Sequence, residues 1–271
     1  MGVQMVEPIS LNLVRFIGTG LLFLPFAGRI SLSDLIKLIP VSLFFVSGNL
    51  ICAYIALDYV SSNSFIILVQ SAQPFTLVLA WFLFKERFGI YTTAGIIIAL
   101  SGLIVVFGAP DILSAPFGAF MVLAAAFFWS VGSLAMKRTG HIKPAAFLSY
   151  SYLMSSPIAL IATYMLEDHQ VQSFIDADLL TIGFVLVYQI GLMGIMTFVW
   201  SDLMARYPAQ YITPFLMLQP IVAIIGSYFM LGEELTHEII MGGIIVLFGI
   251  GIINFRSLTL FKKAEKTAST E

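Results

Sequence analysis

Long apolar runs, separated by short polar connections, follow one another along the whole chain. A helix needs about 20 largely apolar residues to cross the roughly 30 Å hydrocarbon layer of a membrane. The pattern predicts nine such helices, at residues 9–27, 34–57, 61–84, 90–108, 116–136, 144–165, 179–205, 209–231 and 238–257. The runs show no alternation with a period of two, which favours helices over the strands of a barrel.

Composition indicates the same class of protein. Of the 271 residues, 59% are apolar and 10% are charged, which is too little polar surface to coat a water-soluble domain of this size. A single cysteine, Cys52, excludes a disulfide-stabilised scaffold, and a net charge of −2 without a basic stripe argues against nucleic acid. We therefore expect an all-α polytopic membrane protein. Its expected partners are the lipid bilayer and a small-molecule substrate, with no nucleic acid and with a homodimer as an open alternative.

The basic residues lie on one side of the predicted membrane. Alternate connections and the C-terminal tail hold 12 of the 13 Lys and Arg residues, whereas the other connections hold only acidic charges. Because positively charged loops stay on the cytoplasmic side, we expect a multi-pass protein of the inner (plasma) membrane with a cytoplasmic C-terminus. Nine spans then place Met1 on the outer side.

Two ordered sets of residues indicate an internal repeat. The first set, Gln73-Pro74, Glu86, Gly95 and Gly102, corresponds to Gln219-Pro220, Glu233, Gly242 and Gly249. The offset is 146 residues at the Gln-Pro pair and 147 at the later positions, and Pro8 and Pro144 head corresponding helices further upstream. The connection within the first copy is basic and that within the second is acidic, so the copies face opposite ways. Inverted repeats are the architecture of many secondary transporters, whose substrate site lies near the midplane between the halves.

With these motifs the chain resembles the EamA-type members of the drug/metabolite transporter superfamily. The matching features are EPISLNLVRF, which contains Arg15, the two Gln-Pro pairs, FKERF, LGEEL and the Gly-rich closing helices. The resemblance implies ten helices in two inverted five-helix halves, and transport of amino acids, metabolites or drugs, often outward. This chain has four helices in the first half and five in the second. The family's first helix is thus expected to be missing, through a late start or as a genuine nine-helix variant.

This organisation leaves no room for a catalytic domain. We expect a first EamA-like repeat at residues 1–110, a second at residues 111–257 and a cytoplasmic tail at residues 258–271. HEXXH, Walker A and Cys/His motifs are absent, and His141, His169 and His237 all fall in connections. The sequence therefore predicts a protein that is not an enzyme and has no cofactor or metal.

Arg15 is the one charge deep inside a predicted helix, about 11 Å beyond Pro8 at 1.5 Å per residue. Asn12, Arg15 and Thr19 are three and four residues apart, so they share one helix face. An ionisable group within a membrane is costly and is a candidate functional site by default. We expect this face to line the substrate path, with Arg15 binding a carboxylate or phosphate in a bidentate manner. Two alternatives stay open: Arg15 extends outward towards Glu7, or it binds backbone carbonyls in a structural role.

The Gln-Pro pairs are the second candidate. A proline within a helix removes one hydrogen bond and displaces the carbonyl four residues earlier, here on Gln70 and Leu216. Pro74 and Pro220 are therefore predicted hinges, each with a free acceptor inside the membrane; a role in packing alone is the alternative. The glutamines expected to add polar contacts there are Gln70, Gln73 and Gln219.

Three further polar residues within the predicted spans complete the expected substrate-binding set: Asn49, Tyr150 and Gln189. A structural role is the alternative for each of them. The whole set predicts a secondary transporter, in the direction of export, of a small organic solute such as an amino acid or related metabolite. The alternatives are a non-transporting membrane scaffold or assembly subunit, and a translocator of lipophiles or drugs.

Overall fold

The structure, a computed structural model, describes residues 7–85, 89–136, 139–168, 170–176, 178–206, 218–232 and 235–268. All regular secondary structure in these residues is helical. Seven of the helical segments are long and apolar enough to cross a membrane, and two shorter apolar helices cover Ile90–Val106 and Gln219–Phe229. Each of these nine segments overlaps one predicted span, although residues 209–217 of the eighth span lie outside the described chain. The prediction of an all-α polytopic membrane protein is confirmed.

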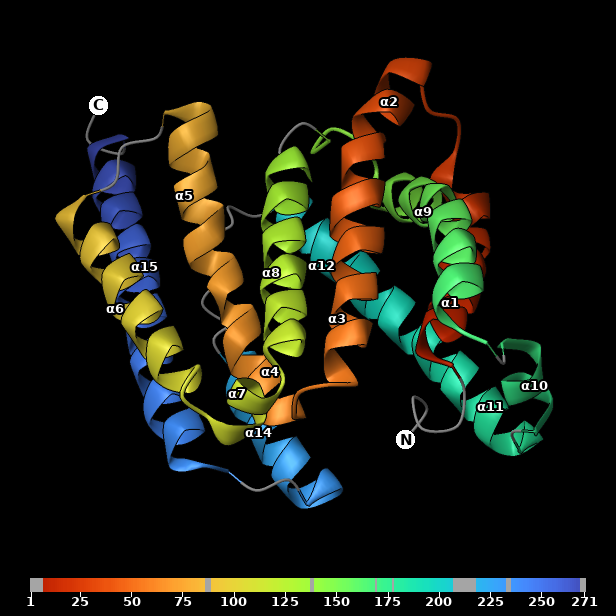
Figure 1. Cartoon of the computed structure of the whole chain (residues 1–271). Helices are drawn as coiled ribbons and strands as arrows, with labels where there is room; N and C mark the ends of the chain where they lie inside the picture. Colours follow the sequence, from red (N-terminus) through yellow and green to blue (C-terminus); the bar gives the residue numbers. More distant parts are fainter. Residues whose placement is uncertain are drawn as a thin grey trace. The chain divides into compact units, whose positions relative to one another are not determined.

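The helices form two compact units, and each unit takes helices from both halves of the sequence. Unit 1 consists of Met1–Tyr54 and Val131–Arg206, and unit 2 consists of Ile55–Ser130 and Tyr207–Glu271. Figure 1 labels the helices along the chain. The boundaries between the units fall within α3 (Asn49–Leu57) and α8 (Pro116–Met136).

Unit 1 is built around two long helices, α1 (Pro8–Ala27) and α9 (Pro144–Leu166), which pack along each other. Its other complete elements are α2 (Leu32–Pro40), the π-helical segment η2 (Val41–Gly48), α10 (Gln170–Asp176), α11 (Leu179–Leu186), the π-helical segment η4 (Val187–Leu192) and α12 (Met193–Arg206). Segment η2 contacts α9, and η4 contacts α1. Each long helix thus packs against a π-helical segment of the other repeat.

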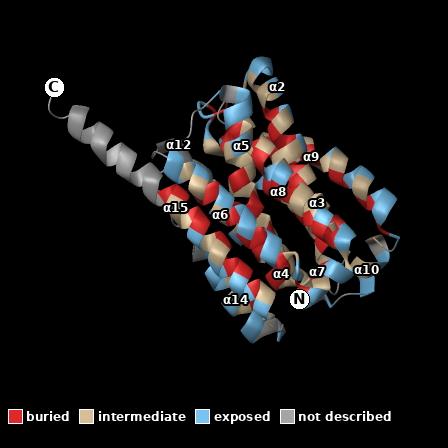
Figure 2. Ribbon diagram, turned by 60° about the vertical axis from the view of Figure 1, so that its left-hand side comes forward, coloured by how far each residue is buried: buried red, intermediate tan, exposed pale blue. Residues whose placement is uncertain are grey.

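Unit 2 is built around α6 (Ile90–Val106) and α15 (His237–Ala268), which lie side by side (Figure 1). Its other complete elements are α4 (Ser62–Leu68), the 3-10 segment η3 (Val69–Ser71), α5 (Ala72–Phe84), α7 (Pro110–Ser114) and α14 (Leu218–Leu231). Figure 2 shows that α6 and α15 each carry buried and exposed faces. The exposed side chains include Ile104 and Phe248, as expected where a helix meets lipid.

The structure differs from the prediction at the end of the last helix and in two of the connections. Helix α15 continues to Ala268, whereas the last helix was expected to end at residue 257. An apolar run detects only the part of a helix that crosses lipid, and the following residues contain Leu, Lys, Ala and Glu with no Gly or Pro to end the helix. Short helices α7 and α10 also occupy two predicted connections; α7 begins with Pro110, whose backbone angle is already helical.

Glycines bring the backbones of α6 and α15 into close contact. A Cβ atom on Gly95 would lie 2.7 Å from the carbonyl oxygen of Gly249, and one on Gly102 would lie 2.8 Å from that of Gly242. Gly95 and Gly102 therefore meet their repeat equivalents in reverse order, so the two helices run antiparallel. Reciprocal pairing of this kind is what a twofold axis between equivalent elements produces. In unit 2 the closing helices of the two repeats thus have opposite directions.

The repeat also extends to irregular backbone geometry. Segments η2 and η4 begin at Val41 and Val187, which are 146 residues apart, the same offset as the Gln-Pro pairs. At their C-terminal ends the N–H of Asn49 donates to the Phe44 carbonyl and that of Met193 to the Tyr188 carbonyl, each five residues earlier. Because π-helical turns are rare and often occur at functional sites, their presence at equivalent places indicates a shared requirement in both repeats.

The glycine contact predicts a large effect of a small side chain. We expect Gly102→Val to lower the melting temperature of the protein in detergent, because overpacking a close contact costs about 1–3 kcal/mol or more. The matched control is Gly226→Val on α14, where an added Cβ meets no atom within 4 Å. Equal melting temperatures for the two variants would show that the α6–α15 contact is not tight.

Candidate functional site

Helix α1 carries a stripe of polar side chains without hydrogen-bond partners among the described residues. Asn12 is 1% exposed, and neither atom of its amide group is hydrogen-bonded. The Thr19 hydroxyl is fully buried and unpaired, and the buried Nε of Arg15 is unpaired as well. More than nine in ten buried polar groups in proteins have a partner, so three on one helix face are unusual. We refer to Asn12, Arg15 and Thr19 as the α1 polar stripe.

Neighbouring side chains place the α1 polar stripe beside η4 and α12. A Cβ on Gly18 would collide with Ile190 of η4, and one on Gly194 of α12 would lie 3.3 Å from Cγ2 of Thr19. Further along, the Phe23 and Phe198 rings stack with centroids 5.4 Å apart. Along these contacts the residue numbers increase in the same direction on α1 and on the segment formed by η4 and α12, so the two run parallel. Arg15, one turn before Thr19, is therefore level with η4.

The structure bears on the alternatives for Arg15. Glu7 forms no ion pair with Arg15, although both residues are described. No hydrogen bond joins the guanidinium to a backbone carbonyl in the described part of the chain. Among the described residues, neither outward pairing with Glu7 nor a bond to a backbone carbonyl occupies the guanidinium group.

Two other predicted residues of unit 1 lie at the π-helical segments. Gln189 belongs to η4 and is half-buried, and Asn49 is the first residue after η2 and is 7% exposed. Gln189 is thus on the segment that is level with Arg15, whereas Asn49 begins α3, directly after the segment η2 that packs against α9.

Tyr150 lies at a different level of unit 1. Its hydroxyl donates to the Gly28 carbonyl oxygen at 2.9 Å, just past the C-terminal end of α1. Gly28 is 13 residues beyond Arg15, about 20 Å along the helix axis. The hydroxyl therefore does not join the α1 polar stripe in this conformation.

Glu167 is a polar residue of the site region that sequence reasoning missed. It follows α9 and is 7% exposed, although the sequence places it in an acidic connection. Its Oε1 accepts from the Ile9 N–H at 2.5 Å, and its Oε2 accepts from the N–H and hydroxyl of Ser10 at 2.9 and 2.5 Å. The partners are 157 and 158 residues away, so no local pattern could have identified this contact.

Unit 2 holds the Gln-Pro pairs. Pro74 is the third residue of α5, and the preceding turn, η3, is a 3-10 segment that includes Gln70. The predicted interruption of the span is therefore present. The predicted free carbonyl is not: the Ala72 N–H donates to the Val69 and Gln70 oxygens, because the 3-10 turn supplies a replacement donor.

Side chains support the backbone at this interruption. The Ala72 carbonyl accepts from the hydroxyl of Thr76 at 2.7 Å and from that of Ser130, on α8, at 2.8 Å. In the second copy Gln219 is exposed and Pro220 is buried as the third residue of α14, while Leu216 lies outside the described residues. Of the site set, Gln70, Gln73, Pro74, Gln219 and Pro220 belong to unit 2, and Asn12, Arg15, Asn49, Tyr150 and Gln189 belong to unit 1.

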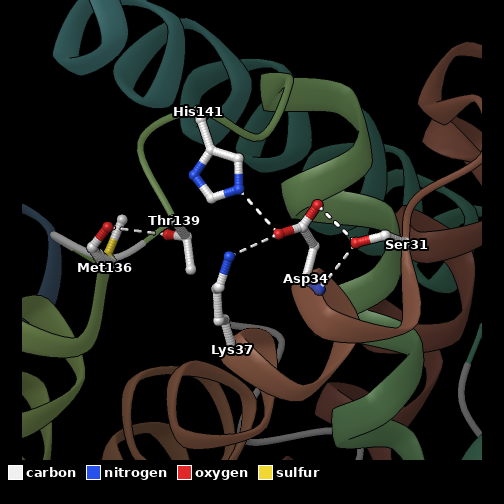
Figure 3. Close-up of polar contacts among 6 residues, drawn as sticks. All are labelled: Ser31, Asp34, Lys37, Met136, Thr139 and His141. Carbon is white, nitrogen blue, oxygen red and sulfur yellow. Dashed lines mark hydrogen bonds and ion pairs between the residues drawn. The ribbon is translucent and has the colours of Figure 1, made fainter.

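A second polar cluster in unit 1 has its donors and acceptors matched (Figure 3). Asp34, in the first turn of α2, accepts from Lys37 Nζ at 2.8 Å, lies 2.8 Å from Nε2 of His141, and accepts from the Ser31 hydroxyl at 2.9 Å. Ser31 also caps α2 by accepting from the Asp34 N–H. This cluster ties α2 to the connection before α9. Among the described residues no group of His, Cys, Asp and Glu is arranged to hold a metal ion.

Known proteins are similar to this chain in sequence. The profile of the EamA-like transporter family matches residues 1–108 and 116–255. A probable amino-acid metabolite efflux pump of Salmonella typhimurium is 30% identical over 201 residues, which are 70% of this chain and 67% of that protein. An uncharacterized transporter of Bacillus subtilis is 26% identical over 272 residues, 94% of this chain and 89% of that protein.

A solved crystal structure shares the fold, with a TM-score of 0.61 at 18% identity over 92% of this chain and 88% of that one. The family match covers two successive segments, in agreement with the repeat in the sequence and with the reciprocal contacts of α6 and α15. This multi-pass membrane protein therefore belongs to the EamA-like transporter family, within the drug/metabolite transporters.

Proposed function

We propose that the protein is a secondary transporter that exports a small organic solute, such as an amino acid or a related metabolite, by alternating access. The observation that carries the proposal is the α1 polar stripe, whose buried polar atoms have no partner among the described residues. Burying an unpaired polar group costs free energy, and a substrate that supplies the missing partners removes that cost. The printed names of relatives in Salmonella typhimurium and Escherichia coli, amino-acid metabolite efflux pumps, support this solute class.

The chemistry of the α1 polar stripe suits a solute with both a negative group and hydrogen-bonding groups. Arg15 offers a planar fork of donors that matches a carboxylate or phosphate. Asn12 has an amide group with two N–H donors and one acceptor oxygen, and the Thr19 hydroxyl can both donate and accept a hydrogen bond. Asn12 and Thr19 are seven residues apart, about 10 Å along α1, a length that a small organic solute can span.

Alternating access requires helices that can change shape. Segments η2 and η4 contain backbone turns outside the regular α-helical pattern, as does η3 before Pro74. We propose that these segments and the Pro74 and Pro220 positions bend during transport, and that the glutamines beside the prolines supply polar groups within unit 2. The charge distribution supports a cytoplasmic C-terminus in the inner membrane.

Replacement of Arg15 tests the proposal in proteoliposomes loaded with labelled amino acids and related metabolites. Arg15→Ala should lower transport by about tenfold to a hundredfold, since hydrogen bonds to charged groups contribute about 1.5–3 kcal/mol. Transport by Arg15→Lys should be intermediate between that of the unmodified protein and that of Arg15→Ala. Lysine keeps the positive charge but lacks the planar, bidentate donor group of arginine. Arg29→Ala, at an exposed position after α1, is the matched control and should transport normally.

Three outcomes would contradict the proposal. Normal transport by a well-folded Arg15→Ala variant would remove Arg15 from the substrate path. No flux of any solute, together with a stable protein partner on purification, would identify a membrane scaffold instead. Competition by lipophilic compounds but not by amino acids would identify a lipophile translocator.

Tyr150→Phe separates a structural tyrosine from one that binds substrate. We expect KM for transport to stay unchanged, because the hydroxyl is bonded to Gly28 rather than placed beside Arg15. The melting temperature should fall slightly, since one hydrogen bond contributes about 0.5–1.5 kcal/mol. A raised KM with an unchanged melting temperature would instead place the hydroxyl on the solute in another conformation.

A further inference from the structure

The α1 polar stripe carries a positive charge that no described carboxylate balances. Arg15 is the one charge deep inside a predicted helix, and it forms no ion pair with a described residue. Two other carboxylates of unit 1 already have partners: Glu167 is hydrogen-bonded to the start of α1, and Asp34 is paired with Lys37. The anion that Arg15 can bind must therefore come from the solute.

This unbalanced charge disfavours a free α-amino acid. The ammonium group of such a solute is attached to the carbon that carries the carboxylate, so a carboxylate bound to Arg15 brings the ammonium close to the guanidinium. Like charges repel, and the repulsion is stronger in a low-dielectric interior than in water. An ammonium group buried without a carboxylate partner adds a further cost. A monoanionic solute, in contrast, neutralises Arg15.

The Asn12 side chain indicates a second group on the solute. Asn12 is 1% exposed, and both its amide oxygen and its amide nitrogen lack a partner among the described residues. A second amide is the complement of this pair, because its carbonyl accepts from the Asn12 N–H while its own N–H donates to the Asn12 oxygen. Exchange of the oxygen and nitrogen positions of Asn12 leaves the argument unchanged, since both atoms are unpaired.

The spacing along α1 allows one small solute to reach both groups. Asn12 and Arg15 are three residues apart and are neighbours on the helix surface, with about 5–6 Å between their Cβ atoms. When an α-amino acid is acylated on its nitrogen, the resulting amide and the carboxylate are attached to the same carbon. Thr19, one turn beyond Arg15 on the same face, can donate its hydroxyl to the carboxylate from the other side.

The buried surface beside the α1 polar stripe is apolar and aromatic. Phe16 follows Arg15 directly, is fully buried, and lies with its ring centroid 5.5 Å from that of Tyr152. Phe23, one turn beyond Thr19, stacks on Phe198. A solute with an apolar side chain fits next to such a surface, because ligand sites combine a few polar groups with apolar walls.

We infer that the substrates of the α1 polar stripe are N-acylated amino acids with apolar side chains. Arg15 binds the carboxylate and Asn12 binds the amide. Acylation serves both contacts, because it removes the ammonium charge and creates the amide. The inference rests on the proposed transport function and specifies the solute class within it.

A binding series tests the inference without any transport assay. Thermal stabilisation of the protein in detergent is measured with four ligands that share one side chain: N-acetyl-leucine, leucine, the corresponding α-hydroxy acid, and N-acetyl-leucinamide. N-acetyl-leucine has both the charge and the amide and should bind at least about tenfold more tightly than each of the others. Equal or tighter binding of leucine or of the hydroxy acid would overturn the inference.

Variants of Asn12 assign the amide contact. Asn12→Leu should bind N-acetyl-leucine and the hydroxy acid equally, with the affinity for the hydroxy acid unchanged. Asn12→Asp, which is close to Asn in size, should prefer leucine to N-acetyl-leucine, because a carboxylate at this position is a partner for the ammonium group. If both folded variants keep the original preference for N-acetyl-leucine, the inference is wrong.

The matched control is Ser151→Ala on α9. Ser151 is fully buried, and its hydroxyl has no partner among the described residues, but it does not belong to the α1 polar stripe. The control should keep the order of the four affinities. Loss of that order in Ser151→Ala would also overturn the inference, since selectivity would then not be specific to Asn12.

Counterflow in proteoliposomes gives a separable result. Labelled N-acetyl-leucine should enter liposomes loaded with the same unlabelled compound faster than leucine enters liposomes loaded with leucine. Counterflow of leucine without that of N-acetyl-leucine would overturn the inference and leave the proposed function standing. Absence of flux for every solute would contradict the proposed function, and the binding series would still decide which solute the α1 polar stripe recognises.

Discussion

A hydrocarbon layer offers no hydrogen-bond partner. Each polar group of this chain that lies within the membrane must therefore be hydrogen-bonded within the protein. Regular helices satisfy nearly all backbone groups, and this requirement explains why all regular secondary structure in the described residues is helical. Among the described residues, departures from the regular α-helix within the spans are confined to η2, η3 and η4. There π-helical or 3-10 turns, or side-chain hydroxyls, supply the hydrogen bonds of the backbone groups. The Ala72 carbonyl, with hydroxyl donors from Thr76 and Ser130, shows how side chains support such a place.

The same requirement makes the α1 polar stripe stand out. Among the other buried hydroxyls of unit 1, those of Ser149 and Ser155 donate to the Gly20 and Ser42 carbonyls, whereas those of Ser47, Ser151 and Thr163 have no partner among the described residues. The α1 polar stripe differs from these in that it carries a guanidinium and an amide group. Asn12 and Thr19 are as deeply buried and have no such partner among the described residues. A membrane protein retains unpaired groups at a cost in stability, and this cost is the physical basis of the proposed role of the α1 polar stripe in substrate binding.

The scaffold is repeated, but its chemistry is not. Counted from the prolines that head the two helices, Arg15 and Thr19 of α1 correspond to Ser151 and Ser155 of α9. Ser155 donates to backbone carbonyls of Ser42 and Ser151, so the second copy uses this position for packing against η2. The guanidinium charge therefore occurs in one repeat alone. The repeat is therefore evident in the helices and their contacts, while the first repeat has the cationic Arg15 where the second has Ser151.

Sequence alone determined the class of protein and located the nine apolar helical segments, because apolar length and residue order are local properties of a chain. It also placed Asn12, Arg15 and Thr19 on one face, since helical spacing follows from residue number. Only the tertiary structure decided which groups meet. Gly95 faces Gly249 rather than its equivalent Gly242, and Glu167 reaches the start of α1, because antiparallel packing joins opposite ends of paired helices. The π-helical turns likewise needed the structure, since no proline or charge within them signals the change in hydrogen bonding.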